Sequence, residues 1–319
     1  MNNSLKEIAE TINNATDIAL ITHTSPDPDT IGSCFALKSA LEDKGKKVTV
    51  YTDDVLPAYL SFIYDDYTVY NAPTAHELCI SVDCGDLGRI GARAALLQAA
   101  NTSVNIDHHP TNTGFAMLNY VEPGAAATAE IIDALLTELS VEMNTVIATR
   151  LYSALTGDTG SFRYSNTTPR TMHLAAKLLD YGVDNWSINK TIFEDMSLNE
   201  LKLRGALAER MQVLCDGKVC AVVLTKDLCE TYGLELTEVE NIVNIPRSVV
   251  GCEIAASFKE SDGKVKISLR SSSYADVSAI AVSFGGGGHK RAAGFVLEGE
   301  TSEVVNKVLS AACLCINEG

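Results

Sequence analysis

Acidic residues and histidines interrupt the apolar pattern of the N-terminal half at points where apolar runs end. Four short segments carry them: "THTSPDPD", "VDCGD", "DHHP" and "TGDTGSF". The candidate residues are His23, Asp27, Asp29, Asp83, Asp107, His108, His109 and Asp158. A mixed set of imidazoles and carboxylates suits Mn²⁺ better than Mg²⁺, which prefers an all-oxygen shell. These segments could therefore contribute to a metal site.

Each of these residues, taken alone, has a simpler interpretation. An Asp after a strand commonly caps the next helix, and a single His is usually a surface or satisfied core residue. That interpretation weakens for the whole set, because crowded carboxylates repel each other unless cations neutralise them. About six ligands suit two ions about 3.5–4 Å apart that share one carboxylate. Such a pair activates water and holds phosphate oxygens, which is the chemistry of a phosphoester or phosphoanhydride hydrolase.

The elements that must position these residues alternate between strand and helix. Apolar runs at 17–22, 47–52, 77–83 and 102–106 predict buried strands, and the patterns at 29–45 and 88–100 predict helices. This alternation predicts an α/β fold with a mostly parallel, doubly wound sheet and helices on both faces. Ligands in that fold gather beyond the carboxyl ends of the strands, where the candidate residues stand.

The pattern changes along the chain, and we divide it accordingly. Residues 1–195 are the predicted catalytic metal-binding domain, which is nearly all helical from 124 onward. Residues 196–215 are a predicted helical connector, and 216–319 a smaller α+β domain. In the last part, two strand-like runs around "SDG" predict a β-hairpin, and a helix is expected at the end.

A glycine run in the smaller domain, "FGGGGHKRAAG" at 284–294, is a second candidate for chemistry. Residues without side chains let the backbone approach an anion and offer N–H groups to it, although a flexible turn is the alternative interpretation. His289, Lys290 and Arg291 follow the glycines directly, and Arg270 is a further candidate for binding phosphate. The run is not a Walker loop, because no Gly-Lys-Ser/Thr follows it.

Composition narrows the function classes. The chain has 319 residues, 46% of them apolar and 21% charged, which is ordinary for a globular protein. A net charge of −16 argues against a protein that coats long nucleic acid. No apolar run approaches the roughly 20 residues of a membrane span, and no signal-peptide pattern is visible, so we expect a cytoplasmic protein. Nine scattered cysteines are expected to be reduced thiols rather than a disulfide framework.

Five motifs, in this order, resemble those of the DHH–DHHA1 phosphoesterase family over nearly the whole chain. "HTSPDPDTIGS" resembles the first motif, "VDCGD" the second, "DHHP" the third and "TGDTGSF" the fourth. "SLRSS…DVSAIAVSFGGGGHKRAAG" resembles the substrate-binding DHHA1 signature. The two-domain length is similar to the nanoRNase/pAp-phosphatase branch, also called bifunctional oligoribonucleases.

The resemblance implies two Mn²⁺ ions, with Mg²⁺ or Co²⁺ as substitutes. It implies that the first ion is held by His23, Asp27 and Asp83. It implies that the second is held by Asp29, Asp83, His108 and Asp158, with Asp83 bridging. By the same resemblance Asp107 orients His108, and His109 faces the scissile phosphate. These last three are therefore the expected catalytic residues.

The resemblance also implies the substrate contacts, which are Arg270, Gly287, Gly288 and His289, with Arg89 as a further contact to phosphate. One residue departs from the family pattern. The family usually has Gly between the two aspartates of the first motif, and this chain has Pro28. Proline fixes φ near about −65° and lacks an N–H, so a family loop with positive φ there would have to differ.

The sequence therefore predicts a cytoplasmic Mn²⁺-dependent phosphoesterase. It would cleave short RNA oligonucleotides to nucleoside 5′-monophosphates, with removal of the 3′-phosphate of pAp as a second activity. We expect no binding to long duplex DNA or membranes, and the resemblance suggests a homodimer. A phosphodiesterase mainly for linear or cyclic dinucleotides, such as pApA or cyclic di-AMP, needs the same residues and stays open. A nucleotide sensor without catalysis is disfavoured by the complete ligand set.

Overall fold

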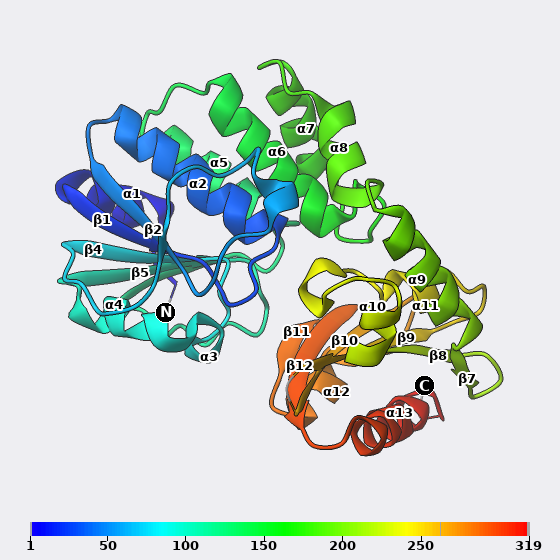
Figure 1. The fold of residues 1–319 in the computed structure, drawn as a ribbon. Helices are drawn as coiled ribbons and strands as arrows, with labels where there is room; N and C mark the ends of the chain where they lie inside the picture. Colours follow the sequence, from blue (N-terminus) through cyan, green and yellow to red (C-terminus); the bar gives the residue numbers. More distant parts are fainter. Residues whose placement is uncertain (1, 262, 318–319) are drawn as a thin grey trace. The chain divides into compact units, whose positions relative to one another are not determined.

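The computed structural model describes residues 2–261 and 263–317 and divides into two compact units, residues 1–195 and 196–319 (Figure 1). Each unit has its own apolar core. Across the described ranges, no helix has the length and apolar character needed to cross a membrane. Asp262, in the turn of the predicted hairpin, lies outside the described residues.

The first unit is built on a six-stranded sheet in the order β3-β2-β1-β4-β5-β6, with every neighbouring pair parallel. The strands are β1 (Asp17–Ile21), β2 (Lys47–Thr52), β3 (Thr68–Val69), β4 (Leu78–Val82), β5 (Thr102–Asp107) and β6 (Leu118–Val121). This confirms the predicted α/β fold. The strand order reverses between β1 and β4, and ligands of such sheets bind beyond that switch point.

Helices cover both faces of this sheet (Figure 1). One face carries α1 (Leu5–Asn14), α2 (Pro28–Asp43), α5 (Thr128–Glu138) and α6 (Thr145–Thr159), and α7 (Pro169–Leu179) and α8 (Asn185–Phe193) pack on α6. The other carries α3 (Leu87–Ile90) and α4 (Ala94–Ala99). The single helix predicted at 88–100 is wrong. Gly91, with φ of 61°, ends α3, and a 3-10 turn (Gly91–Arg93) precedes α4.

Helices α2 and α6 approach each other closely because each contributes a glycine. A Cβ atom added to Gly32 of α2 would lie 2.9 Å from Cβ of Ala154 and would also collide with the carbonyl oxygen of Arg150. A Cβ atom added to Gly157 of α6 would lie 2.8 Å from Cβ of Pro28. The contacts run in opposite directions along the two helices. The N-terminal end of α2 therefore lies beside the C-terminal end of α6.

The second unit is an α+β domain with a mixed sheet in the order β11-β12-β10-β9-β8-β7. Its strands are β7 (Gln212–Leu214), β8 (Val219–Leu224), β9 (Ile254–Ser261), β10 (Lys264–Ser271), β11 (Gly287–His289) and β12 (Ala292–Glu298). Its helices are α9 (Leu198–Glu209), α10 (Lys226–Thr231), α11 (Asn244–Arg247), α12 (Val277–Ser283) and α13 (Thr301–Asn317). Strands β9 and β10 pair antiparallel, which confirms the predicted hairpin.

Helix α9 lies in the stretch that the sequence suggested as a connector. Its Leu203 and Leu207 are buried against Val222 and Leu224 of β8, so by packing it belongs to the second unit. The helix ends at Glu209, and the chain continues into β7 rather than as helix. Further 3-10 turns are Ala58–Leu60 and Leu236–Glu238.

Two cysteines of the second unit are joined. Cys215 and Cys313 form a disulfide with their Cα atoms 6.3 Å apart, so the expectation of reduced thiols is wrong for this pair. The free cysteines are Cys34, Cys79, Cys84, Cys220, Cys229, Cys252 and Cys315. All but Cys315 are buried, which is the usual situation of cysteines that pack as small apolar residues.

Candidate metal centre

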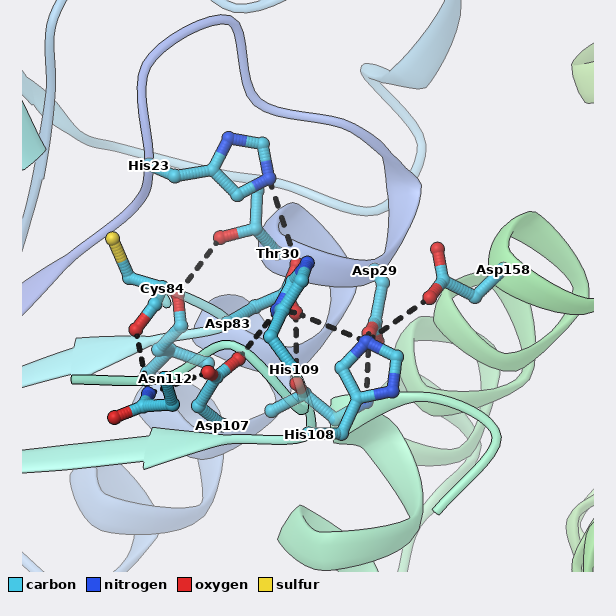
Figure 2. A network of polar contacts seen from close by, with 12 residues as sticks. His23, Asp29, Thr30, Asp83, Cys84, Asp107, His108, His109, Asn112 and Asp158 are labelled. Atoms are coloured by element: carbon cyan, nitrogen blue, oxygen red, sulfur yellow. Dashed lines mark hydrogen bonds and ion pairs between the residues drawn. The ribbon is translucent and has the colours of Figure 1, made fainter. Parts of the chain in front are cut away.

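Acidic and imidazole side chains from distant parts of the first unit converge at the carboxyl edge of the parallel sheet (Figure 2). His23 follows β1, Asp83 follows β4, and Asp107 is the last residue of β5. Asp29 lies in the first turn of α2 and Asp158 in the last turn of α6. The fold of the first unit thus brings together residues as far apart in the sequence as His23 and Asp158.

The first group consists of His23, Asp27 and Asp83, whose ligand-type atoms all lie within 4.8 Å of one another. Nε2 of His23 is 3.5 Å from Oδ2 of Asp27 and 3.5 Å from Oδ2 of Asp83. Nδ1 of His23 donates to the carbonyl oxygen of Thr24 at 2.8 Å, which leaves Nε2 to act as a ligand. Nε2 is buried and has no hydrogen bond to any described residue. A buried nitrogen between two carboxylates fits a bound cation.

The second group consists of Asp29, His108 and Asp158. Nε2 of His108 lies 3.2 Å from Oδ2 of Asp158 and 3.9 Å from Oδ2 of Asp29. Nδ1 of His108 donates to the carbonyl oxygen of Ala125 at 3.1 Å, so its Nε2 also faces the carboxylates. The two groups are therefore alike, because each contains a histidine whose Nδ1 donates to a backbone carbonyl oxygen and whose Nε2 faces carboxylates.

Asp83 connects the two groups. Its Oδ2 faces His23, and its Oδ1 faces Nε2 of His108 at 3.5 Å. Oδ1 also accepts a hydrogen bond from the hydroxyl of Thr128 at 2.9 Å. The backbone of Asp83 has φ of 60°, a conformation that Asp and Asn tolerate better than most residues. A carboxylate that presents one oxygen to each group is suited to bridge two cations.

Asp29 is held by the start of α5. The backbone N–H of Thr128 donates to its Oδ2 at 2.7 Å, and the N–H of Ala129 donates to its Oδ1 at 3.2 Å. The hydroxyl of Ser33 donates to Oδ1 at 3.1 Å. Thr128 thus contacts two candidate ligands, and the sequence analysis missed it. Its signal is weak, because a Thr at the start of a helix is usually only a cap.

Asp107 has a different partner from the expected one. Its Oδ1 accepts from Nδ1 of His109 at 2.7 Å, and its Oδ2 accepts from the amide of Asn112 (Figure 2). The expectation that Asp107 orients His108 is therefore wrong, because the carbonyl of Ala125 does so. Nε2 of His109 lies 3.4 Å from the guanidinium of Arg89, which brings Arg89 to the same edge.

The carboxylates hold protons on both buried histidines. Burial alone would lower the pKa of His23, but Asp27 and Asp83 outweigh burial and the charge of Arg89 and raise that pKa to about 9. Burial likewise opposes the charge of His108, yet the surrounding carboxylates raise its pKa well above the usual value. Without cations, therefore, these imidazoles supply the compensating positive charge.

The pKa of the Asp29 carboxyl is also shifted by its crowded surroundings. Burial raises its pKa, and the charges of Asp83 and Asp158 raise it well above the usual value. Asp107 differs, because burial raises its pKa but the hydrogen bonds from His109 and Asn112 and the charges of His109 and His108 together outweigh burial and lower that pKa to about 2. Divalent cations that replace these protons would neutralise the crowded carboxylates and would leave the imidazoles uncharged as ligands. The imidazole and carboxylate donors fit a divalent metal cation.

Three of the four candidate substrate contacts of the second unit lie at positions on one face of its sheet, namely Arg270, Gly287 and His289. Ala292 of β12 pairs with Arg270 of β10 on one side and with His289 of β11 on the other. Directly paired residues point to the same face, so Arg270 and His289 flank the small side chain of Ala292. Gly287 pairs with Gly294, which keeps the adjacent position free of side chains.

The glycine run is part turn and part strand, because Gly285 lies in the turn after α12. Gly287 and Gly288 lie in β11. A Cβ atom on Gly288 would lie 2.7 Å from Cα of Ala293, and one on Gly286 would collide with Phe295. The absence of side chains therefore lets β11 pack against β12, in addition to any role in binding an anion.

Comparison with known proteins agrees with this arrangement. The model of the DHH family, N-terminal domain, matches residues 17–155, and that of the DHHA1 domain matches residues 216–318. The chain is 32% identical over 300 residues to the bifunctional oligoribonuclease and PAP phosphatase NrnA of Thermus thermophilus, a match that covers 92% of this chain and 88% of that protein. The chain belongs to the DHH family. NrnA of Bacillus subtilis is 28% identical over 291 residues, covering 90% of this chain and 91% of that protein.

A solved structure of a DHH-family relative shares the whole architecture. The crystal structure of an exopolyphosphatase-related protein from Bacteroides fragilis superposes with a TM-score of 0.86 at 25% sequence identity. The match covers 97% of this chain and 95% of that one, so both units have counterparts there.

Pro28, in the first DHH motif of this chain, occupies a helix position that commonly holds proline. Asp27 caps α2, with its Oδ1 accepting from the N–H groups of Asp29 at 3.0 Å and Thr30 at 3.1 Å. Pro28 is the first residue of the helix, where its fixed φ fits and no N–H is needed. The aspartates on either side of Pro28 thus belong to an ordinary helix start.

Proposed function

We propose that this DHH-family chain is a Mn²⁺-dependent phosphoesterase that hydrolyses short RNA oligonucleotides to nucleoside 5′-monophosphates and removes the 3′-phosphate of pAp. Asp83 is the observation that carries the proposal, because its two oxygens face two imidazoles that belong to separate ligand groups. NrnA, a bifunctional oligoribonuclease and PAP phosphatase that is similar to this chain over most of its length, supports the choice of substrate.

The proposal assigns the ligands as follows. One cation is held by His23, Asp27 and Asp83. The other is held by Asp29, Asp83, His108 and Asp158. The donor set favours Mn²⁺, with Mg²⁺ or Co²⁺ as substitutes. When bound, two such cations activate a water molecule and neutralise phosphate oxygens during in-line attack.

The remaining residues act on the phosphate and the substrate. Asp107 fixes the Nδ1–H tautomer of His109, which leaves Nε2 to face the scissile phosphate beside Arg89. Arg89 supplies positive charge for the phosphate oxygens. In the DHHA1 domain we assign substrate contacts to a further set. These are Arg270, Gly287, Gly288 and His289.

The partners follow from the same proposal. They are short RNA oligonucleotides, dinucleotides and pAp, whereas the net charge of −16 disfavours long duplex DNA. A homodimer and a cytoplasmic location stay predictions.

The proposal is tested by chromatographic product analysis. The protein is stripped of metal, supplied with Mn²⁺, and incubated separately with pAp, pApA, cyclic di-AMP, an RNA pentanucleotide and pyrophosphate. We expect mononucleotides from the pentanucleotide and pApA, AMP from pAp, and no turnover without metal. Cleavage of pyrophosphate alone, or of no substrate, would refute the proposal.

Substrate length separates the proposal from its main rival. If kcat/KM falls sharply for RNA several times longer than a pentanucleotide, the enzyme acts on short RNA. If cyclic di-AMP or pApA is cleaved much faster than the pentanucleotide, the dinucleotide phosphodiesterase is the better description. Equal rates on short and long RNA would contradict the preference for short substrates.

A further inference from the structure

We propose that the contact between Pro28 and Gly157 is a positioning element that sets the spacing of the Asp29 and Asp158 carboxylates. The inference rests on the proposed metal site and deepens it by naming two residues outside the ligand set. Neither residue has a side-chain group that binds metal. Their effect on the site must therefore pass through the helices that carry the ligands.

Pro28 and Gly157 each precede a candidate ligand. Pro28 is the first residue of α2 and stands before Asp29, whereas Gly157 lies in the last turn of α6 and stands before Asp158. A Cβ atom at position 157 would lie 2.8 Å from Cβ of Pro28, 3.2 Å from its Cγ and 3.7 Å from its Cδ. The proline ring therefore fills the space that a side chain at position 157 would need.

A second close contact between α2 and α6 prevents the helices from adjusting easily around Pro28 and Gly157. One turn along α2 from Pro28, Gly32 packs against Ala154, which lies about one turn before Gly157 in α6. Two contacts one turn apart fix both the separation and the angle of the two helix ends. A side chain at position 157 must therefore push the last turn of α6 away from the first turn of α2.

The size of that displacement exceeds what a metal site tolerates. Carbon atoms in contact are about 3.5–4.0 Å apart, so relief of a 2.8 Å approach requires a shift of about 1 Å. Ligand distances in a metal site hold within about 0.2 Å. Oδ2 of Asp158 and Oδ2 of Asp29 lie 3.2 and 3.9 Å from Nε2 of His108, and a shift of this size would separate them.

The chain offers a matched set of variants for the test. Gly157→Ala introduces the Cβ atom, and Pro28→Gly removes the whole ring that it meets. Pro28→Ala removes the rest of the ring but keeps Cβ, the atom nearest to position 157. Comparing it with Pro28→Gly therefore shows whether contact with this Cβ atom causes the effect. Gly205→Ala is the control, because Gly205 is a helical glycine in α9 with open space around its missing Cβ. Mn²⁺ affinity is measured from the electron paramagnetic resonance signal of free Mn²⁺, independently of turnover.

We expect Gly157→Ala to weaken Mn²⁺ binding by about tenfold or more, by analogy with changes in groups that orient ligands. Combining it with Pro28→Gly should restore binding to the level of Pro28→Gly alone, whereas combining it with Pro28→Ala should not. Gly205→Ala should bind as wild type does. Unchanged binding in Gly157→Ala, or equal restoration by both partners, would overturn the inference.

Failure to fold, loss of Mn²⁺ binding in wild type and equal binding in wild type and variant have different consequences. If Gly157→Ala does not fold, the double variant with Pro28→Gly must fold and bind Mn²⁺ while the one with Pro28→Ala does not, and any other pattern overturns the inference. If wild type itself binds no Mn²⁺, the proposed function fails. If wild type binds and Gly157→Ala binds equally, only the positioning role fails.

Discussion

Replacing Asp83 with Asn should abolish stabilisation by Mn²⁺ while leaving the metal-free protein nearly as stable as before. Asn keeps the shape of the side chain, tolerates a φ of 60°, and can still accept the hydrogen bond from Thr128. The variant loses the negative charge that lies 3.5 Å from each of His23 and His108.

The expected change in stability is worked out first for the metal-free protein and then for the protein with Mn²⁺. Without metal, the variant loses attraction to two protonated imidazoles but also loses repulsion with Asp29, so we expect a change in the free energy of unfolding within about 1 kcal/mol. With Mn²⁺ at about 1,000 times its Kd, binding stabilises the folded state by about 4.1 kcal/mol per site. For a unit of residues 1–195, one site corresponds to a rise in Tm of about 8–16 °C.

The assay is calorimetric melting with Mn²⁺ and with EDTA, alongside turnover of pApA. The control is Asp133→Asn, which makes the same charge change at a carboxylate paired with Lys177, outside both ligand groups. Wild type and the control should gain the full shift. Asp83→Asn should gain almost none, and its turnover should fall by several orders of magnitude. A normal Mn²⁺ shift in Asp83→Asn would refute the bridging role.

Further predictions address the protons, the positioning of His109 and the independence of the units. Since the raised pKa values keep His23 and His108 protonated near neutral pH, Mn²⁺ binding should release about two protons. Titration calorimetry in buffers of different ionisation enthalpy measures this number, and a binding enthalpy that does not depend on the buffer would contradict the prediction. In EDTA, the contribution of His23 is fully present below pH 6.5 and lost through about pH 9, so Tm should fall across that window; a rise would contradict the assignment. Asp107→Asn should lower kcat about 10–100-fold with Mn²⁺ affinity retained, whereas an equal loss of affinity would make Asp107 a ligand. Phe258→Ala should cost about 3–5 kcal/mol in urea unfolding of the second unit, and altered Mn²⁺ binding would show that the two units are energetically coupled.

The parallel sheet could be predicted from the sequence because its central strands are buried on both faces. Residues Ile18–Ile21 are fully buried, so they form a continuous apolar run rather than an alternating one. Strand β6 was not predicted, because at the sheet edge Asn119 and Tyr120 replace such a run. The helix break at Gly91 was also missed, since a glycine within a helical pattern does not reveal its own φ.

The candidate site could be predicted in its residue types but not in its pairings. Buried Asp and His residues stand out where apolar runs end. The choice of His109 over His108 as the partner of Asp107 depends on side-chain directions within the folded loop. The contact of Thr128 with Asp83 joins residues far apart in the sequence, and no local pattern records it.

The packing of Pro28 against Gly157 also constrains the order in which these positions can change during evolution. Glycine at position 157 accommodates either glycine or proline at position 28, whereas proline at position 28 accommodates only glycine at position 157. A lineage that carries a side chain at position 157 must lose it before it can acquire the proline. Once the proline is fixed, the route back through position 157 is closed until position 28 reverts.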